Sequence, residues 1–192
     1  MQTPWRSAIH QPQPELVTEP RVLRISGAAQ RVHSDVHLAE ASPGEARFLW
    51  FALGQPEMDE EDWRQFEITP ENAAKMVDQA NAALAQKEIW VNYGHDAYGP
   101  RAGDAVRFEV GPDGGVYGVV RWNEAARSAI KQDPPVWKYF SPEFYASEVL
   151  DEKGRAKVVN GRQVLQPFEI SGGGLTNTPA MVKLVVTASA SR

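Results

Sequence analysis

Short runs of alternating or continuous apolar residues, separated by turn residues, recur along most of this chain and predict a mainly β fold. A run of four to eight such positions bounded by Gly, Pro, Asn or Asp is typical of a strand. Two turn signals, Pro112-Asp113-Gly114 and Asn160-Gly161, predict hairpins between consecutive strands. We expect strands at 21–26, 32–38, 46–53, 88–93, 104–110, 116–122, 137–144, 156–159, 162–166 and 182–186.

Two segments have the 3.6-residue period of a helix instead. In 69–87 the apolar residues recur every three or four positions, Thr69 is a suitable N-cap and Pro70 suits the first helical position. A shorter helix is expected at 123–132, where Asn123 is the N-cap. Because the strands are short and closely spaced, we expect a mostly antiparallel barrel or folded-over sheet with short helices packed outside it.

The chain divides into three parts by composition. Residues 1–20 are rich in Pro and Gln without a period, and we expect a flexible N-terminal arm. Residues 21–186 form one domain, which is long enough to bury a sizeable core. The small residues of 187–192 predict a flexible tail or a processing boundary.

Charge and cysteine content exclude several classes of function. The net charge of −5 provides no basic field to attract nucleic acid or an anionic membrane, so we expect neither as a partner. The chain has no Cys, which excludes disulfides, a Cys nucleophile and thiolate metal sites. No apolar run approaches the roughly 20 residues that a membrane span needs, and no export signal is visible.

Ser141 and His95 are the candidates for chemistry. Ser141 lies inside the aromatic run 137–144, where it is either a packing residue or a nucleophile held on a rigid strand. A nucleophilic serine needs a base, and His95 is the histidine that lies between a predicted strand and a Gly-rich turn. The adjacent Asp96 is expected to stabilise that turn.

A second constellation lies on the predicted strand 32–38. There His33, Asp35 and His37 share one face, and imidazole and carboxylate groups are common metal ligands. However, the first and last of them lie roughly 13 Å apart on an extended strand, too far for one ion without a bulge. A solvated strand face is the simpler interpretation.

The order of several motifs resembles the Mu-like phage I protein family over roughly residues 60 to 185. The motifs are Gly-His-Asp at 94–96, the hairpin segment Asp-Gly-Gly-Val-Tyr-Gly-Val-Val at 113–120, Tyr-Phe-Ser-Pro-Glu-Phe at 139–144, and Leu-Thr-Asn-Thr-Pro-Ala at 175–180. That family is a prohead maturation protease, similar to the wider phage prohead proteases and the herpesvirus assemblins. The resemblance implies a herpesvirus-protease-like antiparallel β-barrel and a serine endopeptidase activity, with Ser141 as nucleophile and His95 as general base.

The third catalytic residue does not follow from the resemblance. In related families it is a His or an acid three positions before the Leu of the closing motif, where this chain has Gly172. Either the enzyme uses a dyad, or Glu169 or Asn177 orients His95. The oxyanion donors are expected among the backbone N–H groups of the glycine run, with Gly173 and Gly174 as candidates.

The resemblance also implies partners and a location. The substrates would be the phage scaffold and major capsid proteins and the chain itself, inside the procapsid in the host bacterial cytoplasm. We expect no cofactor. The oligomeric state is left open, with a homo-oligomer as one alternative. Two alternatives stay open: a non-catalytic capsid-assembly or scaffold protein, and a metal-dependent hydrolase using His33, Asp35, His37 and His95.

Overall fold

The computed structural model describes residues 22–26, 30–31, 44–55, 57–58, 62–177 and 181–183. The predicted strand 32–38, with its two histidines, lies outside these residues, as do the arm 1–20 and the tail 187–192. Within the described ranges the elements are β1 (Val22–Ser26), β2 (Gln30–Arg31), β3 (Glu45–Phe51), β4 (Glu57–Met58), β5 (Arg64–Phe66), α1 (Pro70–Leu84), β6 (Trp90–Tyr93), β7 (Arg101–Val110), β8 (Val116–Trp122), α2 (Glu124–Lys131), β9 (Tyr139–Glu148), β10 (Val158–Val159), β11 (Arg162–Thr176) and β12 (Met181–Lys183).

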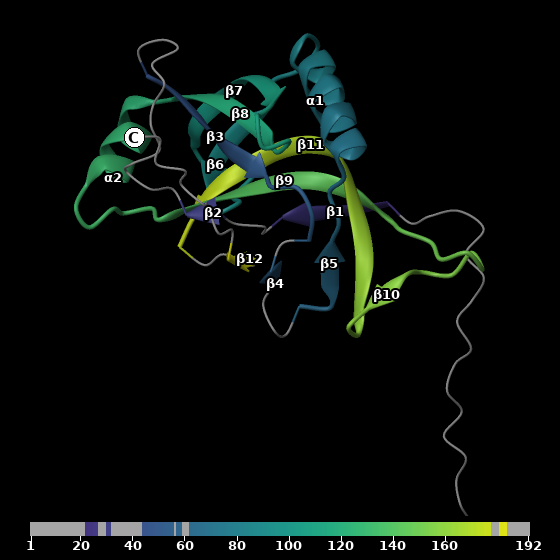
Figure 1. Cartoon of the computed structure of the whole chain (residues 1–192). Coiled ribbons are helices and arrows are strands. Elements are labelled where there is room, and N and C mark those ends of the chain that lie inside the picture. Colours follow the sequence, from purple (N-terminus) through teal and green to yellow (C-terminus); the bar gives the residue numbers. More distant parts are fainter. Residues whose placement is uncertain are drawn as a thin grey trace, which may run out of the picture.

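One large sheet contains most of these strands. Its main order is β1-β9-β11-β6-β7-β8-β3, while β2, β5 and β10 pair at its margins, and β4 pairs with β12 in a separate small sheet. The long strands β9 and β11 run antiparallel to each other through the middle of the molecule (Figure 1). On its other side β11 is parallel to β6, so the sheet is mixed.

The mainly β prediction is confirmed, but a closed barrel is not. Among the described residues, β1 and β3 are the two ends of the sheet. Strand β1 pairs with β9 and β3 pairs with β8, but within these residues β1 and β3 do not pair with each other. Parallel pairs of β11 with β5 and β6 further separate this sheet from the antiparallel barrel that was expected. None of the helices in the described ranges is long and apolar enough to cross a membrane.

Aromatic rings hold the two parts of the sheet face to face. The Phe140 ring of β9 lies 4.5 Å from the Trp50 ring and 4.8 Å from the Phe48 ring of β3, centroid to centroid. Phe144, four residues along β9 on the same face, packs on Phe51 at 5.1 Å. These rings bring together strands that are not neighbours in the sheet, so the sheet folds over one shared core.

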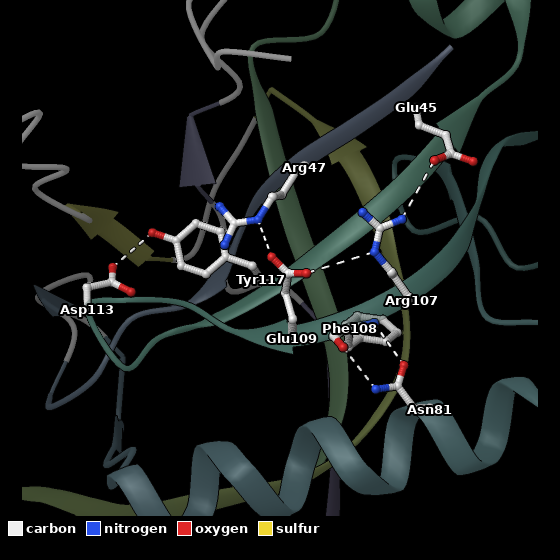
Figure 2. A network of polar contacts seen from close by, with 8 residues as sticks. All are labelled: Glu45, Arg47, Asn81, Arg107, Phe108, Glu109, Asp113 and Tyr117. Carbon is white, nitrogen blue, oxygen red and sulfur yellow. Dashed lines mark hydrogen bonds and ion pairs between the residues drawn. The ribbon is translucent and has the colours of Figure 1, made fainter. Parts of the chain in front are cut away.

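Helix α1 forms as the sequence predicts and covers part of that core. The Thr69 side chain accepts a hydrogen bond from the Asn72 N–H, which caps the helix, and the apolar stripe is buried. On the same helix, Asn81 accepts from the Phe108 N–H and donates to the Phe108 carbonyl, both at 2.9 Å (Figure 2). The amide therefore binds backbone groups of β7 as a neighbouring strand would.

The outer face of β3, β7 and β8 is polar. Arg47 is bound to Glu109, and its guanidinium lies 4.0 Å from the centre of the Tyr117 ring (Figure 2). Burial, together with the hydrogen bond to Asp113, raises the pKa of Tyr117. These side chains alternate with core residues along each strand, which is the pattern of a sheet with one face packed and one face toward water.

Candidate active site

The chain reverses direction directly after β6, and His95 lies in this reversal. Gly94 and His95 have φ values of 62° and 63°, in the left-handed region that costs a non-glycine residue roughly 1–2 kcal/mol. The Gly94 N–H donates to the Leu175 carbonyl at 2.7 Å, and the Asp96 N–H donates to the Tyr93 carbonyl at 3.1 Å. These bonds fold the turn back onto β11 and bring His95 with it.

The pairing of three neighbouring strands places the candidate residues on one face of the sheet. Ser141 of β9 is opposite Gly174 of β11, and Gly174 is opposite Asn92 of β6. Glu143 is opposite Gly172 in the next row on that face. Directly opposed residues point to the same side of a sheet, as do residues two apart on a strand. Ser141, Glu143 and Asn92 therefore lie around Gly172 and Gly174, which have no side chains.

The His95 ring fills the space above Gly174 and binds Glu143. A Cβ added at Gly174 would lie 3.0 Å from His95 Nδ1 and 3.1 Å from Cε1, so the ring rests directly on the strand. His95 Nδ1 is 2.8 Å from Glu143 Oε1, and the side chains are 19% and 8% exposed. A carboxylate at this distance can accept a hydrogen bond from the ring and so fix its orientation.

Three polar atoms at this place have no partner. Ser141 Oγ, His95 Nε2 and Asn92 Oδ1 are buried and make no hydrogen bond, so Ser141 and His95 are not bonded to each other. Ser141 is 0% exposed. An unpaired buried polar atom costs about 1–3 kcal/mol, and a group of them calls for an explanation. A ligand that supplies the missing partners is one such explanation, and serine and histidine together are the pair needed for nucleophilic catalysis.

The two residues predicted to orient His95 have other partners. Glu169 forms an ion pair with Lys87 at 3.2 Å. Asn177 accepts from the Lys138 N–H at 3.1 Å and donates to the Val136 carbonyl at 2.9 Å. Neither bonds to the His95 ring, whose contact is Glu143. Glu143 is not among the residues predicted from the sequence, although its spacing of two from Ser141 on a strand places it on the same face.

The glycine run has a packing role in β11. A Cβ at Gly173 would lie 2.6 Å from two atoms of the Phe140 ring, and one at Gly174 would meet His95. Both glycines lie where β11 is flanked by β9 and β6, and the N–H groups of such a strand point along the sheet. The expectation that Gly173 and Gly174 donate to an oxyanion stays a prediction.

The alternative metal site cannot be placed, because His33, Asp35 and His37 lie outside the described residues. Within the part of the chain that the structure describes, no group of three or more His, Asp or Glu side chains is arranged to hold a metal ion.

Comparison with known proteins identifies a family. Among curated proteins and solved structures, no match to this chain was found. The sequence profile described as Mu-like prophage I protein, N-terminal domain, matches residues 52–187, which include His95, Ser141 and Glu143. Because this match covers more than half of the sequence, the chain belongs to the Mu-like prophage I protein family and is a prophage-related protein.

Proposed function

We propose that this chain is a serine endopeptidase of phage prohead maturation, with Ser141 as nucleophile and His95 as general base. Glu143 is the third member, which fixes the imidazole through Nδ1. The observation that carries the proposal is the His95 Nδ1–Glu143 Oε1 contact of 2.8 Å beside the buried Ser141. It supplies the orienting group that a serine–histidine pair needs.

The reaction would proceed in two steps. Ser141 Oγ attacks the scissile carbonyl carbon while its proton passes to His95 Nε2, and this proton then goes to the leaving amine as the C–N bond breaks. In the second step a water molecule gives a proton to the same nitrogen and attacks the carbonyl carbon of the acyl-enzyme. The imidazolium then returns this proton to Ser141 Oγ as the acyl C–O bond breaks, which releases the acid product and restores Ser141. Throughout, the negative charge of Glu143 stabilises the imidazolium that forms in each step.

The free protein is not in the reacting geometry. The His95 ring rests on Gly174, which is opposite Ser141, but Ser141 Oγ and His95 Nε2 are not bonded, and Ser141 is closed to solvent. Catalytic hydrogen bonds are often long before substrate binds. Substrate binding would have to expose the buried Ser141 and bring its hydroxyl to the imidazole of His95. We therefore expect slow cleavage by the isolated chain.

The family supports a proposal for substrates and location. The scaffold and major capsid proteins, and the chain itself near 187–192, would be cleaved inside the procapsid within the host bacterial cytoplasm. Mass spectrometry of a chain extended beyond Arg192 tests self-processing. An intact mass after prolonged incubation would count against it, whereas a new C-terminus in this segment that disappears in Ser141→Ala would support it.

Covalent labelling tests the mechanism directly. A small alkyl fluorophosphonate should modify Ser141 in the native protein, with the adduct located by peptide mass spectrometry. Labelling should be lost in Ser141→Ala and should persist in Ser147→Ala, which removes a serine from the same strand β9. If the native protein is not labelled, or if Ser141→Ala still cleaves, the serine mechanism is wrong. Loss of cleavage in chelator would favour the metal-dependent hydrolase, and absence of any cleavage would favour a capsid-assembly role.

A further inference from the structure

Asn92 is a buried amide that the catalytic steps above do not use. It is 3% exposed, and its Oδ1 atom has no hydrogen-bond partner. Trp50 Nε1, Asn72 Oδ1 and Ser171 Oγ are also buried without a partner in the described ranges. Asn92 differs from them in lying on the same row of the sheet as Ser141. An amide kept unpaired at a candidate active site points to a ligand that is absent in the free protein.

The position of Asn92 indicates which part of a substrate it meets. Along one row of the sheet, Ser141 and Asn92 lie on either side of Gly174, and the His95 ring rests on Gly174 between them. Two strand spacings separate Ser141 and Asn92 by roughly 10 Å. Because His95 hands its proton to the leaving amine, the leaving half of the substrate passes beside the imidazole. Asn92 flanks the imidazole on the side away from Ser141, which is where that half would continue.

A side-chain amide can bind both groups of a peptide backbone, and this chain contains an example. Asn81 accepts from the N–H and donates to the carbonyl of a single residue, Phe108, at 2.9 Å each. Asn92 has the same donors and acceptor. It is therefore suited to bind the main chain of an extended peptide, which makes recognition independent of the substrate's side chains.

Trp90 and Arg101 form a wall beside this amide. Trp90 is two residues before Asn92 on β6 and so shares its face, and its side chain is 37% exposed. The Arg101 guanidinium lies 4.4 Å from the centre of the Trp90 ring and is held by Glu88 at 2.6 Å. A fixed, partly exposed indole next to an unpaired amide offers apolar contact area to a passing peptide.

We propose that Asn92 binds the peptide backbone of the substrate on the leaving-group side of the scissile bond, with Trp90 as the adjoining wall of that subsite. The ligand is an extended polypeptide recognised through its main chain. This inference rests on the proposed endopeptidase function.

Competition between a small label and a long polypeptide tests this subsite. An alkyl fluorophosphonate needs Ser141 and His95 but does not reach Asn92, whereas reduced, denatured casein occupies the peptide site and slows labelling. In Asn92→Ala, labelling without casein gives that variant's own reference rate, and relative to it the casein concentration for half protection should rise at least about tenfold over that of the native protein, or about 1.4 kcal/mol. Trp90→Ala should also raise the casein concentration for half protection. Trp63→Ala, which removes an exposed tryptophan directly before β5, should leave it unchanged.

Each outcome decides between the two proposals. If the native protein is not labelled at Ser141, the endopeptidase proposal fails and this one fails with it. If labelling occurs but casein gives no protection, or protects Asn92→Ala as well as the native protein, only the subsite is wrong. A parallel loss of labelling and thermal stability in Asn92→Ala would make the residue structural and overturn the subsite. Should Asn92→Ala not fold, the comparison of Trp90→Ala with Trp63→Ala decides alone.

Discussion

Glu143 and Gly172 are directly opposed across β9 and β11, and the carboxylate of Glu143 lies close to where a side chain at position 172 would begin. A Cβ at Gly172 would be 3.7 Å from Glu143 Oε2. The family resemblance places a catalytic His or acid at this position. In the proposed mechanism the acid is Glu143 of the neighbouring strand instead, and the glycine at 172 leaves room for its carboxylate.

Replacing Glu143 by Gln should lower the rate of Ser141-dependent cleavage while leaving substrate binding intact. The amide of Gln keeps the shape of the side chain but removes the negative charge that stabilises the imidazolium in the proposed mechanism. Its NH2 group is also a donor, whereas His95 Nδ1 needs an acceptor. We expect kcat to fall at least about 100-fold with little change in KM. Steady-state kinetics and the rate of fluorophosphonate labelling measure this effect.

Glu169→Gln and Asn177→Ala are the matched controls, because both residues were candidates for the same role. Each should retain kcat within a few-fold, since neither side chain bonds to His95. If Glu169→Gln or Asn177→Ala reduces labelling as strongly as Glu143→Gln does, the assignment of Glu143 is wrong. Partial recovery of labelling in Glu143→Ala combined with Gly172→Asp would support the exchange of the acid between strands.

Gly174→Ala and Gly173→Ala should separate activity from stability. The methyl group at position 174 would lie 3.0 Å from the backbone N and from Nδ1 of His95, so it would displace the ring from Glu143 and Ser141. We expect a large loss of labelling with only a modest change in the free energy of unfolding, because residues 94–99 are exposed or half-buried and lie outside the core.

At Gly173 the added methyl group meets the Phe140 ring, which is 0% exposed and surrounded by other rings. Such overpacking costs about 1–3 kcal/mol of stability. Chemical denaturation of both variants beside the native protein checks the contrast. Equal losses of stability in the two variants would contradict the placement of His95 over Gly174.

The sequence predicted the elements whose side chains have a clear period. The strand expected at 116–122 has those bounds in the structure, and the helix expected at 69–87 is Pro70–Leu84 with Thr69 as its cap. In both, the apolar face is also the buried face, so local pattern and tertiary packing agree. Short margin strands such as β5 were missed because pairing with β11, rather than a local pattern, makes them strands.

The site was predictable only in part. Ser141 and His95 follow from motif order and from their chemistry. The course of β11 through Gly172–Gly174 does not, because glycine carries no side-chain period and reads as a loop. Because that strand was not predicted, there was no register that would place Glu143 opposite Gly172. The contact between His95 and Glu143 also joins residues 48 positions apart, so no local pattern indicates it.

Asp62 should make the stability of the protein depend on pH in the acid range. Its side chain is 8% exposed and accepts from Arg64 Nη2 at 2.7 Å, Arg64 Nε at 2.8 Å and the Arg64 N–H at 2.9 Å. Burial acts to raise the pKa of Asp62, but the hydrogen bonds and charge of Arg64 outweigh it and lower the pKa below its ordinary value of 3.8.

Because this pKa is lower in the folded than in the unfolded chain, the unfolded chain takes up the proton first as the pH falls. The stabilisation is therefore fully present above about pH 4 and is lost as the pH decreases through the folded-state pKa. Asp62→Asn should reduce the free energy of unfolding by about 1–2 kcal/mol at pH 7, and the difference from the native protein should shrink toward pH 2 to 3. Urea denaturation at both pH values measures this difference. Asp151→Asn removes an equivalent but more exposed partner of Arg155 and should cost less at pH 7. A difference for Asp62→Asn that is the same at both pH values would contradict the role of its charge.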